Sequence, residues 1–216
     1  MQKNFEFDFK KTNKKGQIIG TDEAGRGPGA GPVYAAAVYF PNISDNLMAK
    51  LSSLDDSKKL TEQKREELFD IIIQNSIYSI NFSTVEEIEK LNILQASLLA
   101  MKKSVLEVQK LAKIQNPHVL IDGRQLIPNL NFSQEYVIKG DSKSASIAAA
   151  SILAKVSRDR YMKELDLQFP QYGFAKHKGY LTKKHLEAID KYGLCPYHRP
   201  SFLRKHFEKI EQLTLL

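Results

Sequence analysis

Three segments within the first 85 residues have the short, dense spacing of apolar residues that is typical of β-strands. Residues 17–22 (QIIGTD) predict a short strand, residues 33–40 (VYAAAVYF) are apolar on both faces, and residues 77–85 (IYSINFSTV) are rich in β-branched and aromatic side chains. Gly, Pro or Asn bounds these runs, which is typical of strands. Shorter runs at residues 118–121 and 136–138 predict two more strands. A run that is apolar on both faces is expected near the centre of a sheet.

Between and after these strands lie segments whose apolar residues have helical spacing. Thr61 is a suitable N-cap for a helix through EQKREELFDIII. Apolar residues three and four positions apart predict a longer helix that begins at residue 85 or 92 and ends at 114. Residues 143–168 predict another long helix, whose AAASILA segment has side chains small enough to pack closely on a sheet. Short helices are expected at residues 183–191 and 203–213.

The order of these elements predicts an α/β protein. Three strands followed by alternating strands and helices indicate a mixed β-sheet flanked by helices. We expect three parts: a loose, polar lead-in over residues 1–15, the sheet domain over residues 16–170, and a small, basic, helical C-terminal extension over residues 171–216.

Composition excludes several classes of protein. The 216 residues are 42% hydrophobic and 26% charged, as in ordinary globular domains. Cys195 is the only cysteine, so the chain has no internal disulfide and no cysteine-based zinc site, which suits a reducing compartment. The first residues lack the apolar core of a secretory signal, and no run of about 18 apolar residues is present. We therefore expect a monomeric, cytoplasmic protein with no membrane segment.

The distribution of charge indicates where a polyanionic partner would bind. The formal net charge is +7 at pH 7, and residues 172–210 hold nine Lys or Arg against three Asp or Glu. Four of the five histidines lie in the same segment. Such a segment either binds nucleic acid or is a solvated face, and charge alone does not decide between the two.

Acidic residues stand beside a glycine at the end of three predicted strands. Asp22 and Glu23 end the first strand, Asp122 ends the fourth, and Asp141 follows the fifth. Ligands gather where the strands of α/β sheets end, and carboxylates are natural ligands of Mg²⁺ or Mn²⁺. Taken singly, Asp122 could be a turn residue and Asp141 a helix cap. Together the four acids predict a nuclease, because two divalent ions can activate a water and stabilise the leaving oxygen of a phosphodiester.

The segment GRGPGAGP at residues 25–32 follows the first acids directly. Its spacing fits neither the dinucleotide-binding fingerprint nor the P-loop. Its glycines would let backbone groups approach a sugar or phosphate closely, and Arg26 would add a charged contact. The alternative is a plain turn between two strands, although a hairpin needs fewer residues.

Several motifs, in order, resemble those of ribonuclease HII. They are GTDEAGRGP at 20–28, DSKKL at 56–60, DG at 122–123, KGD at 139–141, SIAAASILAKV at 146–156, RDR at 158–160, HKGY at 177–180 and HRPSF at 198–202. The resemblance implies a ribonuclease H-like catalytic domain over residues 16–170. It also implies endonucleolytic cleavage of the RNA strand of RNA–DNA hybrids and of single ribonucleotides embedded in duplex DNA, leaving 5′-phosphate and 3′-hydroxyl ends.

The resemblance implies roles for individual residues. The catalytic acids, which would bind one or two Mn²⁺ or Mg²⁺ ions, the second together with substrate, are Asp22, Glu23, Asp122 and Asp141. Gly25, Arg26 and Gly27 would sense the ribose 2′-hydroxyl, the group that separates RNA from DNA. Tyr180 would stack on the sugar of the following deoxynucleotide. The remaining expected substrate contacts, mainly to phosphates, are Lys58, Lys143, Lys178 and Arg199.

Three positions depart from the usual pattern of this family. Gly29 and Tyr34 replace residues that are commonly aliphatic, and Leu181 follows Tyr180 where Gly or Pro is frequent. These departures put the local loop shape in doubt more than the chemistry.

Two alternatives remain at this point. The sister family, ribonuclease HIII, typically carries Gly-Lys-Gly in the loop and an extra N-terminal domain; Arg26 and the short stretch before the first strand favour HII. A non-catalytic nucleic-acid-binding protein would explain the basic C-terminal segment but would leave the clustered acids unexplained.

Overall fold

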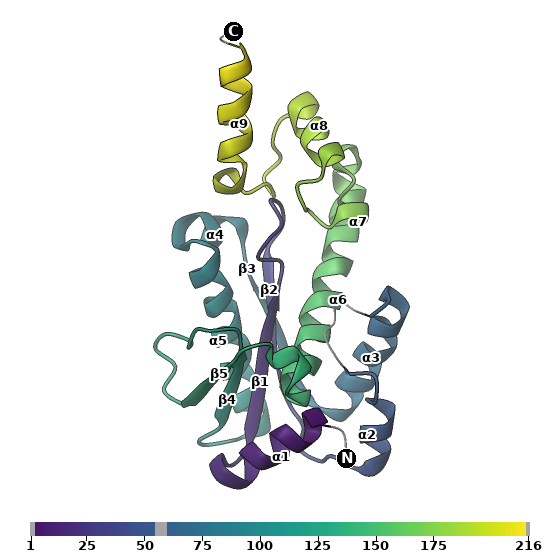
Figure 1. Cartoon of the computed structure of the whole chain (residues 1–216), viewed down its shortest axis with the longest axis vertical. Helices are drawn as coiled ribbons and strands as arrows, with labels where there is room; N and C mark the ends of the chain where they lie inside the picture. The colour runs from purple at the N-terminus through teal and green to yellow at the C-terminus, as the bar shows by residue number, and fades with distance from the viewer. Residues whose placement is uncertain (1–2, 55–59, 215–216) are drawn as a thin grey trace.

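A five-stranded mixed sheet forms the centre of the computed structural model, which describes residues 3–54 and 60–214 (Figure 1). Its strands lie in the order β3-β2-β1-β4-β5. They are β1 (Ile18–Ala24), β2 (Val33–Tyr39), β3 (Ile77–Ser83), β4 (His118–Asp122) and β5 (Ser133–Val137). The first three are antiparallel, and β4 and β5 join them in parallel. The predicted mixed sheet is confirmed, with β5 shifted toward the N-terminus of the expected run.

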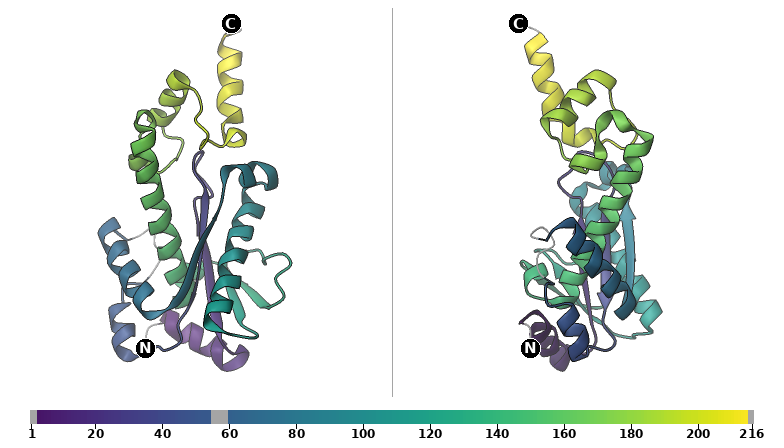
Figure 2. Two further views of the ribbon diagram at one scale, coloured as in Figure 1. Left: turned by 180° about the vertical axis from the view of Figure 1, so that it is seen from behind. Right: turned by 90° about the vertical axis from the view of Figure 1, so that its right-hand side faces the viewer.

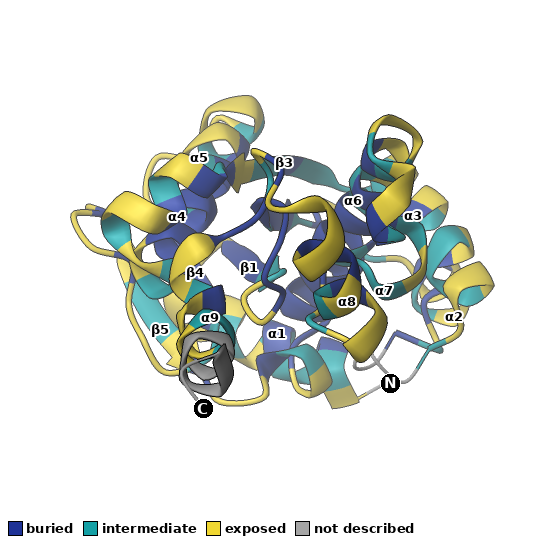
Figure 3. Ribbon diagram, turned by 90° about the horizontal axis from the view of Figure 1, so that it is seen from above, coloured by how far each residue is buried: buried dark blue, intermediate teal, exposed yellow. Residues whose placement is uncertain are grey.

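Helices cover both faces of this sheet (Figures 1 and 2). On one face α5 (Ile93–Ala112) packs against β2 and β3, with the short α4 (Val85–Leu91) before it. On the other face α6 (Ala145–Gln168) packs against β1 and β2, and α3 (Glu62–Asn75) lies beside α6; the short α2 (Asp45–Lys50) precedes α3. Viewed from above, buried residues lie between the two helical layers and exposed residues on their outer sides (Figure 3).

Helix α6 lies close against β1. A Cβ on Gly20 would lie 2.4 Å from the backbone carbonyl carbon of Ser146, so any side chain at position 20 would push the helix away. Ala148, Ala149 and Ala150 are fully buried in the same half of α6. The expected close packing of the small-residue segment is therefore confirmed, and it brings α6 over the end of β1 where Asp22 lies.

The expectation of a loose lead-in over residues 1–15 is wrong for its described part. Lys3–Lys15 form helix α1, which buries Phe5 and Asp8. Phe5 packs near Phe40, and Asp8 Oδ2 accepts hydrogen bonds from the Ser146 amide at 2.8 Å and the Ser146 hydroxyl at 2.7 Å. The polar composition hid this helix, because its few buried side chains find their partners only in distant parts of the chain.

The C-terminal segment packs on the far half of α6. It contains the 3₁₀ turn η2 (Pro170–Tyr172) and the helices α7 (Phe174–His177), α8 (Lys183–Tyr192) and α9 (Pro200–Thr214). Met162 of α6 shares a buried cluster with Phe174, Ile189 and Leu203, and Ala30 of the glycine-rich loop joins it. The two expected short helices are present, and α9 points away from the rest of the molecule (Figures 1 and 2).

No helix within residues 3–54 and 60–214 is both long and apolar enough to cross a bilayer.

Candidate active site

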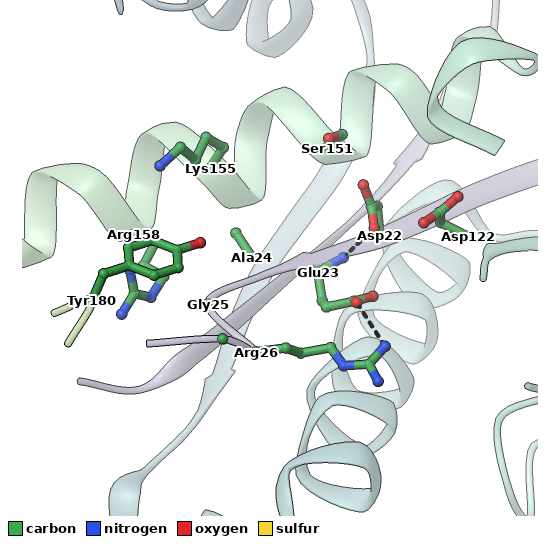
Figure 4. Close-up of a pocket in the computed structure, with 11 residues that line it drawn as sticks. Asp22, Glu23, Ala24, Gly25, Arg26, Asp122, Ser151, Lys155, Arg158 and Tyr180 are labelled. Carbon is green, nitrogen blue, oxygen red and sulfur yellow. Dashed lines mark hydrogen bonds and ion pairs between the residues drawn. The ribbon is translucent and has the colours of Figure 1, made fainter. Parts of the chain in front are cut away.

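Parallel pairing of β1 with β4 brings Asp22 and Asp122 together. Thr21 is the register partner of Ile121, so Asp22 and Asp122 follow side by side at the carboxyl ends of neighbouring strands. Both line a cavity of about 280 Å³ beside α6 (Figure 4). The cavity is lined by Asp22, Glu23, Ala24, Gly25, Arg26, Gly27, Asp122, Ser151, Lys155, Arg158 and Tyr180.

Asp22 lies at the bottom of this cavity. Its side chain is buried, and its Oδ1 accepts a hydrogen bond from the Glu23 amide at 2.7 Å. Burial, followed by the negative charges of Glu23 and Asp122, raises the pKa of Asp22 well above its usual range, and a hydrogen bond from Ser151 opposes this shift. A group so placed gains from a neighbouring cation, because the cation would remove the repulsion between the carboxylates.

Glu23 and Asp122 are held by other partners. Successive residues of a strand point to opposite faces, and Glu23 turns away from α6 to pair with Arg26 at 3.2 Å (Figure 4). Asp122 Oδ1 accepts a hydrogen bond from the Gly140 amide at 2.7 Å. Within the described residues, no three Asp, Glu, His or Cys side chains are gathered closely enough to make a complete metal-binding group. The donor set nevertheless fits a divalent cation of the Mg²⁺ or Mn²⁺ type, since it consists of carboxylates around an open cavity.

Asp141 lies in the 3₁₀ turn η1 (Gly140–Ser142), directly after the glycine that binds Asp122. It is partly exposed and is not among the residues that line the cavity. It does not cap the long helix; Ser144 is the N-cap of α6 and accepts a hydrogen bond from the Ile147 amide. The structure thus brings three of the four predicted acids into one cavity, and the fourth, outside its lining, follows the glycine that binds Asp122.

The predicted substrate residues divide into two groups. Gly25, Arg26, Gly27 and Tyr180 line the cavity, and a Cβ on Gly27 would lie 3.4 Å from Tyr180 Cε1. The others do not line it: Lys143 is exposed elsewhere, the Lys178 ammonium donates to the Ala175 carbonyl, and Lys58 lies outside the described residues. Their roles in binding stay predictions.

Arg199 corrects one of these predictions. Its side chain is fully buried, and its guanidinium donates to backbone carbonyls of residues 25, 26, 28 and 31 in the glycine-rich loop. A buried guanidinium whose donors already bind carbonyls is not placed to contact a phosphate. The sequence could not distinguish these uses of an arginine, because both need a cation near the same loop.

Besides Ala24, three residues of α6 that line the cavity were not predicted as site residues. Ser151, Lys155 and Arg158 project from one side of α6 (Figure 4). Their spacing of four and then three residues places them on one helix face, so this signal was available in the sequence. Lys155 forms an ion pair with Asp159 at 2.7 Å, whereas Arg158 is buried against the loop.

This mixed sheet, with acids at the ends of adjacent parallel strands and a glycine-rich cationic loop beside them, defines a nuclease with a ribonuclease H-like fold. The family model described as Ribonuclease HII matches residues 19–210. The Ribonuclease HII of Fusobacterium nucleatum is 51% identical over 91% of this chain and 90% of its own length. That of Caldicellulosiruptor bescii is 50% identical over 93% of both chains.

Solved structures agree with the sequence relatives. The ribonuclease H2 of Pyrococcus horikoshii has a TM-score of 0.67 at 26% identity and covers 90% of this chain and 99% of its own. The ribonuclease HII of Archaeoglobus fulgidus, solved in complex with PCNA, has a TM-score of 0.67 at 25% identity and covers 85% of this chain and 93% of its own. A ribonuclease HIII solved with Mn²⁺ shares the fold at a TM-score of 0.63 and 18% identity, covering 82% of this chain and 63% of its own.

The chain belongs to the ribonuclease HII family. It is therefore a ribonuclease H endonuclease, a hydrolase that acts on RNA–DNA hybrids. This result decides against both alternatives left open by the sequence, the HIII-type enzyme and the non-catalytic binding protein.

Proposed function

We propose that this enzyme hydrolyses the RNA strand of RNA–DNA hybrids and also cuts at single ribonucleotides embedded in duplex DNA, leaving 5′-phosphate and 3′-hydroxyl ends. The observation that carries the proposal is the meeting of two elements in one cavity. Asp22 and Asp122 form its acidic end, and the Gly25–Gly27 segment with Tyr180 forms the wall beside it. The acids and a surface suited to a sugar thus line the same cavity.

The acids would hold divalent cations. Asp22, Glu23, Asp122 and Asp141 supply only oxygen donors, which Mg²⁺ and Mn²⁺ prefer. When bound, two such ions would supply positive charge for the phosphodiester and lower the pKa of the attacking water. Glu23 would exchange its ion pair with Arg26 for this task, which would free Arg26 for the substrate. A Mn²⁺ complex of a structural neighbour is consistent with this choice of ion.

The loop and Tyr180 would recognise the sugar. A 2′-hydroxyl both donates and accepts hydrogen bonds, so backbone N–H and C=O groups of a glycine loop can detect it at close range. Tyr180 is half exposed, at 51%, and its ring faces the loop at Gly27. A side chain at position 27 would occupy the space between the loop and this ring.

The basic C-terminal segment would bind the backbone of the duplex. Lys183, Lys184 and Arg204 are exposed on α8 and α9, beyond the wall that carries Tyr180. Binding to phosphates through such residues weakens as salt rises. We place the enzyme in the cytoplasm as a monomer, acting on ribonucleotide-containing duplexes there.

A cleavage assay tests the proposal directly. A long RNA–DNA hybrid and a DNA duplex with one ribonucleotide are each incubated with the enzyme and Mn²⁺ or Mg²⁺, and the end groups of the products are determined. Cleavage of both substrates is expected. If the single-ribonucleotide duplex stays intact under both metals, that part of the proposal is wrong.

Tyr180→Ala tests recognition separately from chemistry. The variant should lose much of its cleavage at a single ribonucleotide. It should keep most of the rise in unfolding temperature that Mn²⁺ causes. Tyr192→Ala is the matched control, because Tyr192 is 50% exposed and does not line the cavity. Equal activity of both variants on the single-ribonucleotide duplex would contradict the stacking role.

A further inference from the structure

Two arginines behind the glycine-rich loop are among the most buried side chains of the protein. Arg158 is 1% exposed and Arg199 is 0% exposed. Within the described residues, the hydrogen bonds of both guanidinium groups go to backbone carbonyls, and neither group forms an ion pair with a carboxylate. Burial of a cation is costly, so a pair of them in this position requires a compensating role.

Arg199 spans the loop from end to end. Its Nη2 donates to the Gly25 carbonyl at 2.8 Å and to the Gly31 carbonyl at 2.6 Å. Its Nη1 donates to the Pro28 carbonyl at 2.7 Å, and its Nε to Gly31 at 2.8 Å. Its Nη1 also donates to the Arg26 carbonyl at 3.4 Å. One planar group thus contacts four peptide units of the loop at once, which the single ammonium of a lysine cannot do.

Arg158 joins the loop to the segment that carries Tyr180. Its Nη2 donates to the Ala30 carbonyl at 2.9 Å and its Nε to the Pro32 carbonyl at 3.1 Å. Its Nη1 donates to the Lys178 carbonyl at 2.9 Å, two residues before Tyr180. One side chain therefore holds the glycine-rich loop and the segment before Tyr180 in a fixed relative position.

Gly25, at the start of the loop, has no side chain and so leaves room for Arg158. A Cβ on Gly25 would lie 2.1 Å from Arg158 Nε, and the φ of Gly25 is +101°. The peptide bond after Gly25 is trans, so its carbonyl and the Arg26 N–H point in opposite directions. Because the carbonyl points to Arg199, the Arg26 N–H points away from it. Gly25–Gly27 line the cavity and Arg199 does not, so the loop lies between Arg199 and the cavity.

We propose that Arg158 and Arg199 are positioning residues that set the peptide orientations of the Gly25–Gly27 segment relative to Tyr180 and thereby determine how well the enzyme separates a ribonucleotide from a deoxynucleotide. Both act through the loop. Arg199 does not line the cavity, and Arg158, which does, has each of its three nitrogens hydrogen-bonded to a backbone carbonyl. The inference rests on the proposed recognition of the sugar in this cavity. It assigns to Arg158 and Arg199 a role in specificity, where a purely structural role would affect only stability.

The experiment measures binding, so that it does not depend on cleavage. An Asp22→Asn background is titrated with three duplexes that carry, at one position, a ribonucleotide, a deoxynucleotide or a 2′-O-methyl nucleotide. The ratio of the dissociation constants for the deoxynucleotide and ribonucleotide duplexes is the readout. Arg158→Lys and Arg199→Lys are then added singly, since lysine keeps the charge but cannot bridge several carbonyls.

Two arginines outside the proposed binding surfaces serve as matched controls. Arg160→Lys changes an exposed arginine two residues after Arg158, and Arg65→Lys changes a partly buried arginine on α3 whose Nη1 donates to the Leu60 carbonyl at 2.6 Å. The controls should keep the ratio of the Asp22→Asn background. Each positioning variant should lower that ratio by about tenfold, which corresponds to about 1.4 kcal/mol of lost discrimination.

The outcomes separate this inference from the function on which it rests. If the Asp22→Asn background itself does not distinguish the duplexes, the proposed sugar recognition is wrong. If it does distinguish them, and a folded lysine variant keeps the ratio while all three affinities fall together, the positioning role is wrong. Should a lysine variant not fold, as judged by circular dichroism, the corresponding Arg→Gln variant, which keeps two N–H donors, replaces it with the same readout.

Discussion

Leu181 fills the space that a side chain at position 29 would need. A Cβ on Gly29 would lie 2.5 Å from Leu181 Cδ2. The loop cannot move aside easily, because the Gly29 amide donates to the Gly179 carbonyl at 3.0 Å and the Gly29 carbonyl accepts from the Arg199 amide at 2.8 Å. Both positions depart from the usual family pattern, and in this chain the side chain at 181 occupies the volume that a side chain at 29 would need.

A double-mutant cycle tests this exchange of volume. Gly29→Val should lower the free energy of unfolding by about 1–3 kcal/mol, since it overpacks a tied segment. In the Leu181→Ala background the same change should cost at least about 1 kcal/mol less. Urea unfolding of the four proteins gives the coupling energy. A coupling near zero would mean that the two residues do not compete for the same space.

Asp22→Asn should separate activity from stability. Cleavage should fall by about 10³-fold or more, equivalent to about 4 kcal/mol of transition-state stabilisation. The metal-free variant should be at least as stable as the parent at neutral pH, because burial and neighbouring charges raise the pKa of Asp22 and the native state disfavours its charged form. Mn²⁺ should raise the unfolding temperature of the parent more than that of the variant.

Asp45→Asn, an exposed change on α2, serves as the control for both measurements. An Asp22→Asn protein that is destabilised without metal would contradict the electrostatic account of the site.

Two buried histidines should make the protein less stable in acid. His185 Nε2 lies 3.0 Å from His198 Nε2, and His185 Nδ1 lies 2.9 Å from the Tyr180 carbonyl. The Cys195 amide donates to His198 Nδ1, so His198 carries its proton on Nε2 and donates it to His185. Burial lowers the pKa of both residues from 6.5 to about 4.

Because the unfolded chain takes up these protons at a higher pH than the native state, stability should be lost as pH falls from about 6.5 toward 4. Urea unfolding at several pH values measures the slope. His198→Asn keeps a side-chain acceptor for the Cys195 amide and should show a shallower slope. An unchanged slope in His198→Asn would exclude this pair as the cause.

Asp8 should stabilise the start of α6 from another helix. Asp8→Ala leaves the Ser146 amide and hydroxyl without their acceptor and should cost about 1–3 kcal/mol. Asp8→Asn keeps an acceptor and removes a carboxyl whose pKa burial raises, so it should cost less than Asp8→Ala at neutral pH. Thermal unfolding compares the two with Asp70→Ala, an exposed change on α3. Equal losses for Asp8→Ala and Asp70→Ala would show that the contact does not stabilise the helix.

The sequence by itself determined the strands, the long helices and the presence of acids beside glycine at strand ends. These features depend on local spacing, which is set by the two- and 3.6-residue periods of the backbone. The sequence also determined that Ser151, Lys155 and Arg158 lie on one face of a helix, because residues at that spacing share one side of it.

Only the tertiary structure decided which of these features meet. The pairing of Thr21 with Ile121 sets Asp22 beside Asp122, and the two residues are a hundred positions apart in the chain. Helix α1 is fixed by the buried contacts of Phe5 and Asp8 with distant segments, and Arg199 binds loop carbonyls more than 160 residues away. Such contacts depend on burial and on strand register, and neither leaves a periodic signal in the sequence. The cavity that joins acids, loop and Tyr180 is therefore a product of the fold.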